Sequence, residues 1–297
     1  TKIVLNSIYR LIKIQEPKMK IITYNILDGF ENADDRKNSC AVWLNQQAPD
    51  IVFLNELNGF TAQSLENYAQ KWNHSFSFLL TGRSDYRIAI TSKFPLTNIE
   101  AHFKDLLGHG IIICDCKGVT LINTHLNPHV IEKRHHDLDF IIGKIALLLK
   151  NNKDIIFGGD LNSFFIGEKE IYHDERHHLR KWYVIREKIN SKIKDLIDGQ
   201  FDFTISERLL NASMVDLIST HNKEYRPSYL SKLGKLKLLE NPGFIESKLS
   251  AAFMHARIDY LWANQKLANL CTACYIPQDP ELEEMSDHYP VVATFDF

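Results

Sequence analysis

Short apolar runs that end abruptly at polar side chains recur along this chain and constrain its fold more than any other feature. The run at residues 51–54 is apolar throughout and stops at Asn55 and Glu56. The run at residues 155–157 gives way to glycines and Asp160 in the same manner. Unbroken apolar runs of this length are typical of strands that are buried on both faces. The sequence therefore predicts a layered core with polar groups fixed at its rim.

Helical and strand-like patterns alternate irregularly around these runs. Gly118 separates two strand-like runs and predicts a hairpin, and Pro49 ends a helical pattern. Sheets with both hairpins and interposed helices form layered folds, so the pattern predicts an α/β sandwich with two facing sheets and helices outside. We expect helices at residues 35–48, 61–72 and 130–150, and strands at residues 20–25, 51–54, 76–80, 87–91, 111–116, 119–123, 154–157, 257–262 and 291–297.

One domain accounts for most of the chain. We expect residues 1–19 to form an N-terminal extension and residues 20–297 to form a single domain. Residues 163–250 carry dense charge, and no Pro/Gly/Ser-rich linker bounds them. We therefore expect them to be a long insertion in this domain, not a second domain. The helix face predicted within this insertion consists of Trp182, Val184, Ile185 and Ile189.

The composition disfavours several classes of protein. The net charge is −2, whereas a protein that holds long duplex DNA through its backbone is usually basic. Five cysteines, an odd number without framework spacing, argue against a disulfide-stapled secreted fold. No apolar run approaches the ~20 residues that span a bilayer. We expect a cytoplasmic protein, with secretion by a specialised system left open.

Eight polar residues lie at or beside the ends of the strand-like runs. Any one of them has an ordinary structural explanation, such as a turn or a cap. Together they supply the carboxylate, amide and imidazole groups that a metal-assisted phosphoester hydrolase needs. The eight are Asn25, Glu56, His125, Asp160, Asn162, Asp259, Asp287 and His288.

The carboxylates among them suit a hard divalent cation. Mg²⁺ is usually bound by one or two carboxylates together with water and substrate oxygens. Glu56, at the end of a buried run, is the expected primary ligand. Asp287 is the expected second ligand, directly or through water, and Asn25 offers a neutral oxygen. No cysteine or multi-histidine cluster accompanies them, which disfavours a zinc site.

The remaining groups suit phosphoryl chemistry. We expect Asp160 to orient and deprotonate a water molecule, and Asn162 to hold that water or a phosphate oxygen. His125 and His288 are expected to donate hydrogen bonds to phosphate oxygens as negative charge builds there. Asp259 is expected to accept a hydrogen bond from one imidazole and thereby fix its tautomer.

Six short segments carry a more specific signal: ITYNIL at 22–27, PDIVFLNE at 49–56, NTHL at 123–126, GDLN at 159–162, RIDY at 257–260 and SDH at 286–288. In this order they resemble the endonuclease/exonuclease/phosphatase superfamily, whose members are DNase I-like phosphoesterases. The resemblance implies a four-layer α/β sandwich with the site at one rim of two mixed, mainly antiparallel sheets. It implies Mg²⁺ or Mn²⁺ at Glu56 and water activation by Asp160 with Asn162. It also implies that Asp259 and His288 pair at the phosphate.

Other positions match or depart from the family pattern. Asn55 stands where the family often has a glutamine, and its shorter side chain alters the contacts behind the metal ligand. Arg134, nine residues after His125, matches a basic residue that bacterial members often carry. We expect Arg134 to bind substrate, together with Asn25 and Asn162.

Three functions remain open at this point. The first is an Mg²⁺-dependent phosphodiesterase that acts on nucleic acid or a nucleotide-like diester by in-line water attack. The second is a phosphatase or phosphodiesterase of a lipid, inositol or sugar phosphate headgroup, including one at a membrane surface. The third is a catalytically silent binding module, which the presence of all eight polar residues disfavours. The natural substrate, the endo or exo mode and the oligomeric state stay open. The aromatic residues expected to form a substrate wall are Trp182, Tyr183, Tyr225 and Tyr229.

Overall fold

The structure, a computed structural model, describes residues 18–82, 84–106, 108–174, 177–222, 224–240 and 255–297. The predicted N-terminal extension lies outside these residues up to residue 17. Residues 18 and 19 already belong to the first strand, β1 (Lys18–Asn25). The last part of the predicted insertion, residues 241–250, also lies outside the described residues.

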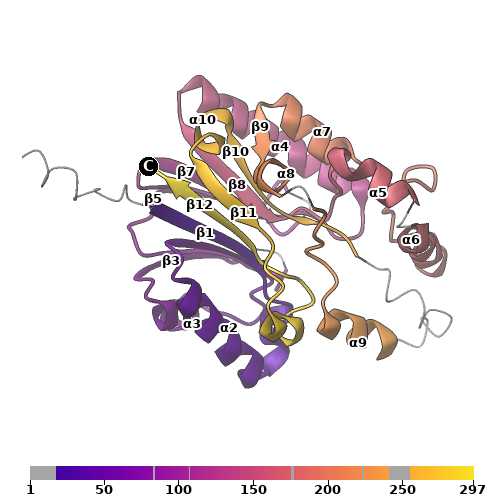
Figure 1. The fold of residues 1–297 in the computed structure, drawn as a ribbon, viewed down its shortest axis with the longest axis horizontal. Coiled ribbons are helices and arrows are strands. Elements are labelled where there is room, and N and C mark those ends of the chain that lie inside the picture. The colour runs from indigo at the N-terminus through magenta and orange to yellow at the C-terminus, as the bar shows by residue number, and fades with distance from the viewer. Residues whose placement is uncertain (1–17, 83, 107, 175–176, 223, 241–254) are drawn as a thin grey trace, which may run out of the picture.

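Two six-stranded sheets form the centre of the described molecule (Figure 1). The order is β11-β12-β1-β2-β4-β3 in the first sheet and β5-β6-β7-β8-β10-β9 in the second. Strands β1 and β2 are parallel, as are β7 and β8, and the other neighbours run antiparallel. The strands are β1, β2 (Ile51–Asn55), β3 (Phe76–Leu80), β4 (Ile88–Ser92), β5 (Thr97–His102), β6 (Ile111–Cys116), β7 (Val119–His125), β8 (Asp154–Asp160), β9 (Met214–Asp216), β10 (Asp259–Asn264), β11 (Cys271–Tyr275) and β12 (Val291–Asp296).

The two sheets pack face to face, and one apolar core fills the space between them. Phe53 of β2, Leu121 of β7 and Leu261 of β10 all belong to this core. Every residue of β2 is buried, as expected for a strand that is covered on both faces. The unbroken apolar runs in the sequence therefore reflect strands at the centre of a layered fold.

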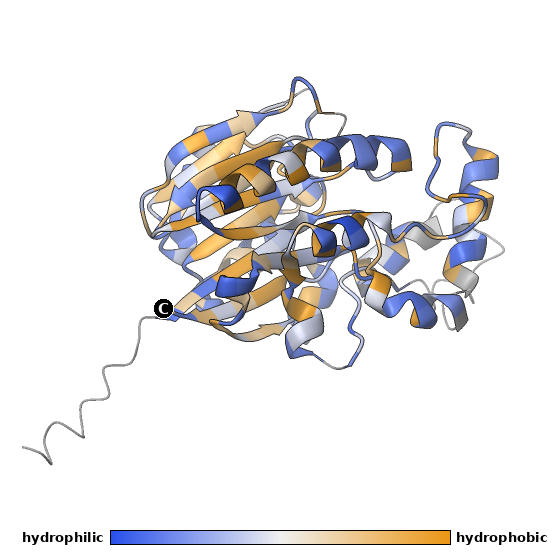
Figure 2. Cartoon of the chain, turned by 90° about the horizontal axis from the view of Figure 1, so that it is seen from above, coloured by the Kyte–Doolittle hydropathy of each residue, from blue (hydrophilic) through white to orange (hydrophobic). Residues whose placement is uncertain are grey.

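Helices cover the outer faces of both sheets. Helices α2 (Asp34–Gln47) and α3 (Ala62–Ala69) lie against the first sheet, and α4 (Ile131–Lys150) and α7 (Thr204–Asn211) lie against the second (Figure 1). Hydrophobic residues concentrate on the strands, and polar residues on the outward faces of the helices (Figure 2). The predicted four-layer α/β sandwich is confirmed.

Three strands have no counterpart in the sequence prediction, and each lacks the pattern of a central strand. Strand β5 is an edge strand whose residues are almost all exposed, so it needs no apolar run. Strand β9 has only three residues. Strand β11 is a second edge strand and mixes exposed with buried positions. The periodicity of buried side chains carries little information at the edges of a sheet.

The predicted ends of three strands are also corrected. The strand predicted at residues 154–157 continues to Asp160, and the one predicted at residues 119–123 continues to His125. The strand predicted at residues 257–262 begins only at Asp259. These shifts matter because they place three candidate site residues on regular backbone.

The insertion folds into helices and the short strand β9. It contains α5 (Lys169–Asp174), α6 (His177–Ile189), α7, α8 (Leu217–His221) and α9 (Lys232–Glu240), and α5, α6 and α9 lie at the opposite end from the C-terminus (Figure 1). The helix face predicted on α6 is wrong for Ile185 and Ile189, which are 46% and 69% exposed. Leu179, Trp182 and Tyr183 contact the core instead.

The described part of the chain contains no helix that is both long and apolar enough to cross a bilayer. All five cysteines are buried and unpaired. Burial raises the pKa of the Cys40 and Cys114 thiols to about 12. This agrees with a packing role for the cysteines.

Candidate active site

Sheet register brings the polar strand ends together at one rim of the sandwich. Asn25 and Asn55 are paired at the ends of the parallel strands β1 and β2, and Glu56 follows directly. In the facing sheet, His125 and Asp160 are paired at the ends of β7 and β8. The carboxyl ends of parallel strands meet at one edge of a sheet. The rim residues therefore converge because of the sheet topology.

A second register contact adds the next carboxylate. Asp259, the first residue of antiparallel β10, pairs with Asp160. The remaining two candidates, Asp287 and His288, precede β12, and the Ser286 hydroxyl just before them donates to the backbone carbonyl of Asn25 at 2.7 Å. The set formed by Asn25, Glu56, His125, Asp160, Asn162, Asp259, Asp287 and His288 is called the polar rim below.

Asn55 fastens the two sheets together beneath the polar rim. Its side-chain oxygen accepts a hydrogen bond from the backbone N–H of Asp160 at 3.0 Å, and its side-chain nitrogen donates to the carbonyl of Thr124 at 3.2 Å. Asn123 donates in the reverse direction, to the carbonyls of Leu54 and Ala89. Buried amide networks of this kind are stabilising only when they are satisfied. Asn55 is therefore a positioning residue for Asp160.

Asn25 connects the two halves of the polar rim. Its side-chain nitrogen donates to Glu56 Oε1 at 3.0 Å and to Asp160 Oδ2 at 3.1 Å. Its oxygen accepts from the backbone N–H of Leu27 at 3.1 Å. The amide oxygen is therefore engaged with the backbone, and the nitrogen holds two carboxylates that face one another.

Glu56 sits on strained backbone. Its φ is 62°, and residues 27–31 all have positive φ as well. The backbone N–H of Asp28 in this left-handed stretch donates to Glu56 Oε2 at 3.0 Å. Left-handed geometry costs non-glycine residues roughly 1–2 kcal/mol each. Such strain persists where the surrounding structure enforces it, and it concentrates at functional sites.

The two carboxylates that share Asn25 are reluctant to ionise together. Burial, followed by the nearby Asp287, raises the pKa of Glu56 to about 7. Burial, followed by Asp259, raises the pKa of Asp160 to about 8. Desolvation and neighbouring like charge both penalise the ionised form. The polar rim thus holds an excess of negative charge that a cation would relieve.

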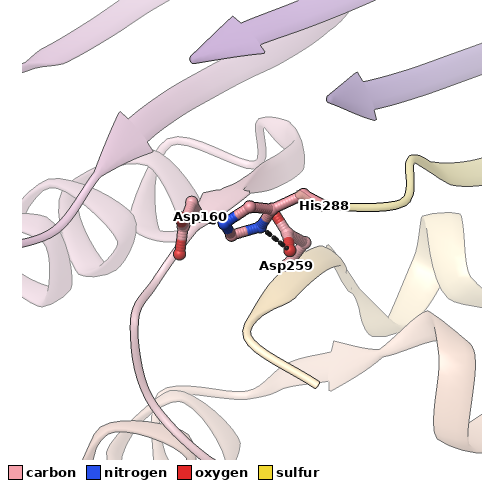
Figure 3. A group of neighbouring side chains, drawn as sticks. All are labelled: Asp160, Asp259 and His288. Atoms are coloured by element: carbon pink, nitrogen blue, oxygen red, sulfur yellow. Dashed lines mark hydrogen bonds and ion pairs between the residues drawn. The ribbon is translucent and has the colours of Figure 1, made fainter. Parts of the chain in front are cut away.

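His288 lies between two carboxylates (Figure 3). Its Nδ1 is 2.7 Å from Asp259 Oδ2, and its Nε2 is 3.7 Å from Asp160 Oδ2. Burial alone would lower the pKa of His288, but Asp259, Asp287 and Asp160 outweigh that effect and raise the pKa well above its usual value. These carboxylates favour the charged form of His288, whose Nδ1 is hydrogen-bonded to Asp259 and whose Nε2 faces Asp160.

Asp259 and His288 are held by the insertion as well as by the sheet. The backbone N–H of Asp259 donates to the Ser228 hydroxyl at 3.0 Å. The ring of Tyr229 packs on the ring of His288, with centroids 4.9 Å apart. Tyr229 thus occupies the place expected of an insertion aromatic beside the site.

His125 differs from His288 in charge. It is buried, its Nε2 lies 3.6 Å from Asp160 Oδ2, and the ring of His109 packs against it at 4.4 Å. Burial, together with His109 and His288, lowers the pKa of His125 well below its usual value. His125 is therefore a neutral imidazole.

Asn162 completes the turn after β8. Its backbone has a φ of 46°, its N–H donates to Asp160 Oδ1 at 2.9 Å, and its side-chain nitrogen donates to the carbonyl of Leu126 at 3.1 Å. The turn therefore fixes the orientation of the Asp160 carboxylate.

A family comparison decides what kind of protein carries this geometry. The model of the Endonuclease/Exonuclease/phosphatase family matches residues 22–288, which include the whole polar rim. The chain belongs to this family. It is a phosphoester hydrolase of the DNase I-like type. No curated protein sequence matches it.

Solved structures show the same fold. An AP endonuclease from Archaeoglobus fulgidus superposes with a TM-score of 0.67 and 20% identity, covering 94% of this chain and 100% of that chain. The 3' phosphatase NExo from Neisseria, bound to a product DNA hairpin, gives 0.66 and 18%, with coverage of 94% and 100%. Truncated TDP2 from Caenorhabditis elegans gives 0.59 and 18%, with coverage of 94% and 98%. At these identities the likeness concerns the fold alone.

The polar rim of this family member offers two groupings for a metal ion. The ligand atoms of Asp160, Asp259 and His288 lie within 4.8 Å of one another (Figure 3). Glu56 and Asp287 form the other grouping, and both supply oxygen ligands. The charge of Asp287 adds to the effect of burial in raising the pKa of Glu56. Among the residues that the structure describes, the buried Asp259 Oδ1 has no hydrogen-bond partner. A divalent cation fits this set, because the carboxylates outnumber the protein's own cations there.

Arg134 does not join the polar rim. It is 4% exposed, and its guanidinium donates to the carbonyl of Asn127 at 3.0 Å and to Asp195 Oδ1 at 3.1 Å. The structure accounts for Arg134 through this buried ion pair. The sequence did not indicate the pairing because Asp195 is 61 residues away.

Two contributors to the site were not singled out from the sequence. His109, between two glycines before β6, packs on His125. Asp28 holds Glu56 through its backbone N–H, and its side chain accepts from Asn58 at 3.0 Å. Gly29 in the same turn lies so close to the Asn58 carbonyl that a Cβ would clash. The Asp28-Gly29 pair is the one sequence signal that could have identified this turn.

Proposed function

We propose that this protein is an Mg²⁺-dependent (or Mn²⁺-dependent) phosphodiesterase that hydrolyses nucleic acid or a nucleotide-like diester by in-line attack of water. The observation that carries the proposal is the double hydrogen bond of Asn25. That amide places Glu56, the candidate metal ligand, opposite Asp160, the candidate base. In-line hydrolysis of a diester needs the base beside the attacking water and the metal within reach of the phosphoryl and leaving oxygens, both around one phosphorus atom.

Asp160 is suited to take a proton from water. A general base works best when its pKa lies near the operating pH, and burial raises the pKa of Asp160 to about 8. The carboxylate is held by Asn162, Asn25 and the sheet backbone, so only a small reorganisation accompanies the transfer. Asn162 presents its side-chain oxygen to the same water.

The two histidines stabilise charge on the phosphoryl oxygens. His288, protonated and backed by Asp259, donates through Nε2. His125, neutral, offers an N–H where Asp160 and the phosphate meet. Preorganised donors at the position of developing charge are worth several kcal/mol in transition-state stabilisation. Asp259 acts through His288 and is a positioning residue.

Glu56 is the residue that we assign to the metal, with Asp287 beside it. Two observations favour this grouping over the one centred on His288. Mg²⁺ prefers oxygen ligands, and the Nδ1 of His288 is already hydrogen-bonded to Asp259 Oδ2 at 2.7 Å. When bound, the ion polarises the phosphoryl group and assists the leaving oxygen. The side-chain oxygen of Asn25, engaged by Leu27, is less suited to bind it.

Hydrolysis of bis-p-nitrophenyl phosphate in Mg²⁺ or Mn²⁺ tests the proposal. We expect Asp160→Asn to lower kcat by about a hundredfold to ten-thousandfold, the range typical of a lost general base. Asp35→Asn, on the exposed side of α2, is the matched control and should leave kcat unchanged.

Other results would point elsewhere. Turnover of phosphate monoesters alone would indicate a headgroup phosphatase. Equal inertness of the wild type and Asp160→Asn with every diester and monoester would indicate a binding module.

A further inference from the structure

Arg186 of the insertion is fixed in place on three sides. Its Nη1 donates to Asp195 Oδ2 at 3.2 Å, and its Nη2 lies 2.7 Å from His129 Nδ1. Its guanidinium also covers the ring of Trp182, 4.9 Å from the centroid. Burial and the Arg186 charge lower the pKa of His129. A neutral His129 accepts this hydrogen bond through Nδ1.

The guanidinium of Arg186 has N–H donors that remain available to another ligand. Arginine has five N–H donors in a planar fork, and the described residues provide hydrogen-bond acceptors for two of those of Arg186. The side chain is 22% exposed, while Asp195 is 1% exposed. Asp195 also pairs with Arg134. One carboxylate thus serves two arginines, while the neighbouring Glu187 carboxylate is engaged by the backbone N–H groups of Asp195 and Leu196.

The cluster is tied to the chain that leaves the polar rim. His129 lies four residues after His125, and residues 129–131 form backbone hydrogen bonds with Lys194, next to Asp195. Asn162 of the polar rim bonds to Leu126 in the same segment. In the ribbon, α6 lies at the end of the sandwich to which β8 runs (Figure 1).

Packing within the insertion connects Arg186 to the site, because Arg186 covers the ring of Trp182, and Trp182 and Tyr229 pack against the same apolar cluster. The pKa of Tyr229 is raised by burial and by Asp287, Tyr183 and Asp160, while Arg186 lowers it. The Tyr229 hydroxyl therefore lies within the field of the polar rim and of Arg186. Because the ring of Tyr229 packs on His288, this apolar cluster connects Arg186 to the polar rim.

We propose that Arg186 binds a second phosphate of the substrate, next to the phosphate that is hydrolysed. A fixed arginine with free N–H groups suits phosphate better than a flexible lysine. The substrate would then carry a second phosphate beside the phosphoester that is hydrolysed. We assign this substrate as a nucleic-acid strand. An inositol polyphosphate carries neighbouring phosphates in the same way. The inference rests on the proposed phosphodiesterase function. Arg186 is a specificity-determining residue and takes no part in the proton transfers.

Binding measurements test this assignment separately from catalysis. In an Asp160→Asn background with Mg²⁺, fluorescence anisotropy would compare a labelled five-residue thymidylate with labelled dTpdT, which has one phosphate. Arg186→Gln should weaken binding of the longer strand by about tenfold, the value expected for a lost charge-assisted hydrogen bond. It should leave dTpdT binding unchanged. Lys188→Gln, an exposed cation on the same helix, is the matched control.

The outcomes separate the two proposals. Equal weakening with both ligands, or none with either, would overturn the role of Arg186. An Arg186-dependent gain for inositol bisphosphate but not for the longer thymidylate would overturn the nucleic-acid assignment. Failure of the wild type to cleave bis-p-nitrophenyl phosphate would count against the phosphodiesterase function alone. Asp195 retains Arg134 in the variant, so folding should persist, and an unchanged unfolding midpoint would verify this.

Discussion

The polar rim and the insertion hold their functional side chains by different means. At the rim, sheet register sets the position of each residue, as in the pairing of His125 with Asp160 and of Asp160 with Asp259. In the insertion, side chains fix one another, as Asp195 fixes Arg186. Register tolerates little displacement, because a slip by one residue turns every side chain to the other face. Ion pairs between helix side chains are less constrained than strand register, so the insertion can present different side chains to a substrate.

The two regions meet at Arg257, and replacing it is expected to have the largest effect. Arg257 lies two residues before Asp259 of the polar rim, and its fully buried guanidinium pairs with two acids of the insertion, Glu168 at 2.6 Å and Asp216 of β9 at 2.9 Å. Arg257→Met would leave these acids unpaired, and removal of one partner from a buried pair costs about 3–5 kcal/mol. Urea unfolding would measure the loss.

Arg226→Gln provides the control for Arg257. Arg226 is an exposed insertion arginine that pairs with Glu224 at 3.3 Å, and exposed pairs contribute about 0–1 kcal/mol. If Arg257→Met unfolded no more easily than Arg226→Gln, the insertion would be far less dependent on ion pairs than we infer. A large loss of stability without displacement of Asp259 would show that the rim is held by register alone.

The next effect concerns the rim and its metal. Burial and Asp287 raise the pKa of Glu56, so the folded state retains its proton to higher pH than the unfolded state does. Without metal, stability from this group is therefore full below the usual carboxylate pKa of about 4.3 and is lost as the pH rises to about 7. Mg²⁺ should restore stability above that range. Thermal unfolding with Mg²⁺ or with a chelator would show both effects.

Two variants sharpen this test. Glu56→Gln should abolish most of the Mg²⁺-dependent rise in Tm and reduce the loss of stability between pH 4.3 and about 7. His288→Ala should keep the Mg²⁺ effect while kcat falls, because His288 serves the phosphate in our assignment. The reverse result would place the ion among Asp160, Asp259 and His288, the alternative grouping.

The same contrast explains what the sequence could predict. The polar rim was predictable because each member ends or adjoins an apolar run, and topology alone brings strand ends together. Asn55 was recognisable as a family variant, although its hydrogen bond to Asp160 across the two sheets was not. The position of Arg134 and the proposed role of Arg186 both depend on Asp195. Only the folded chain brings the Asp195 carboxylate into contact with these two arginines. Periodicity on α6 also failed, since Ile189 is exposed.

The smallest expected effect concerns Tyr225, which the sequence analysis placed in a substrate wall. Its hydroxyl lies 3.0 Å from that of Tyr172, which accepts from the backbone N–H of Arg257 at 2.9 Å. Its ring contacts the insertion core. Tyr225→Phe should therefore lower stability by about 1 kcal/mol, the net value of one hydrogen bond, and leave KM unchanged.

Tyr229→Leu provides the contrasting case for KM, because Tyr229 packs on His288 and Tyr225 packs on Tyr172. Urea unfolding and the KM for a five-residue thymidylate would be measured for both variants. A raised KM for Tyr225→Phe at unchanged stability would contradict the core assignment and return Tyr225 to the substrate wall. If only Tyr229→Leu raises KM, the substrate contacts the surface of the insertion between His288 and Arg186. The tyrosines behind that surface, including Tyr225, then serve to hold it in place.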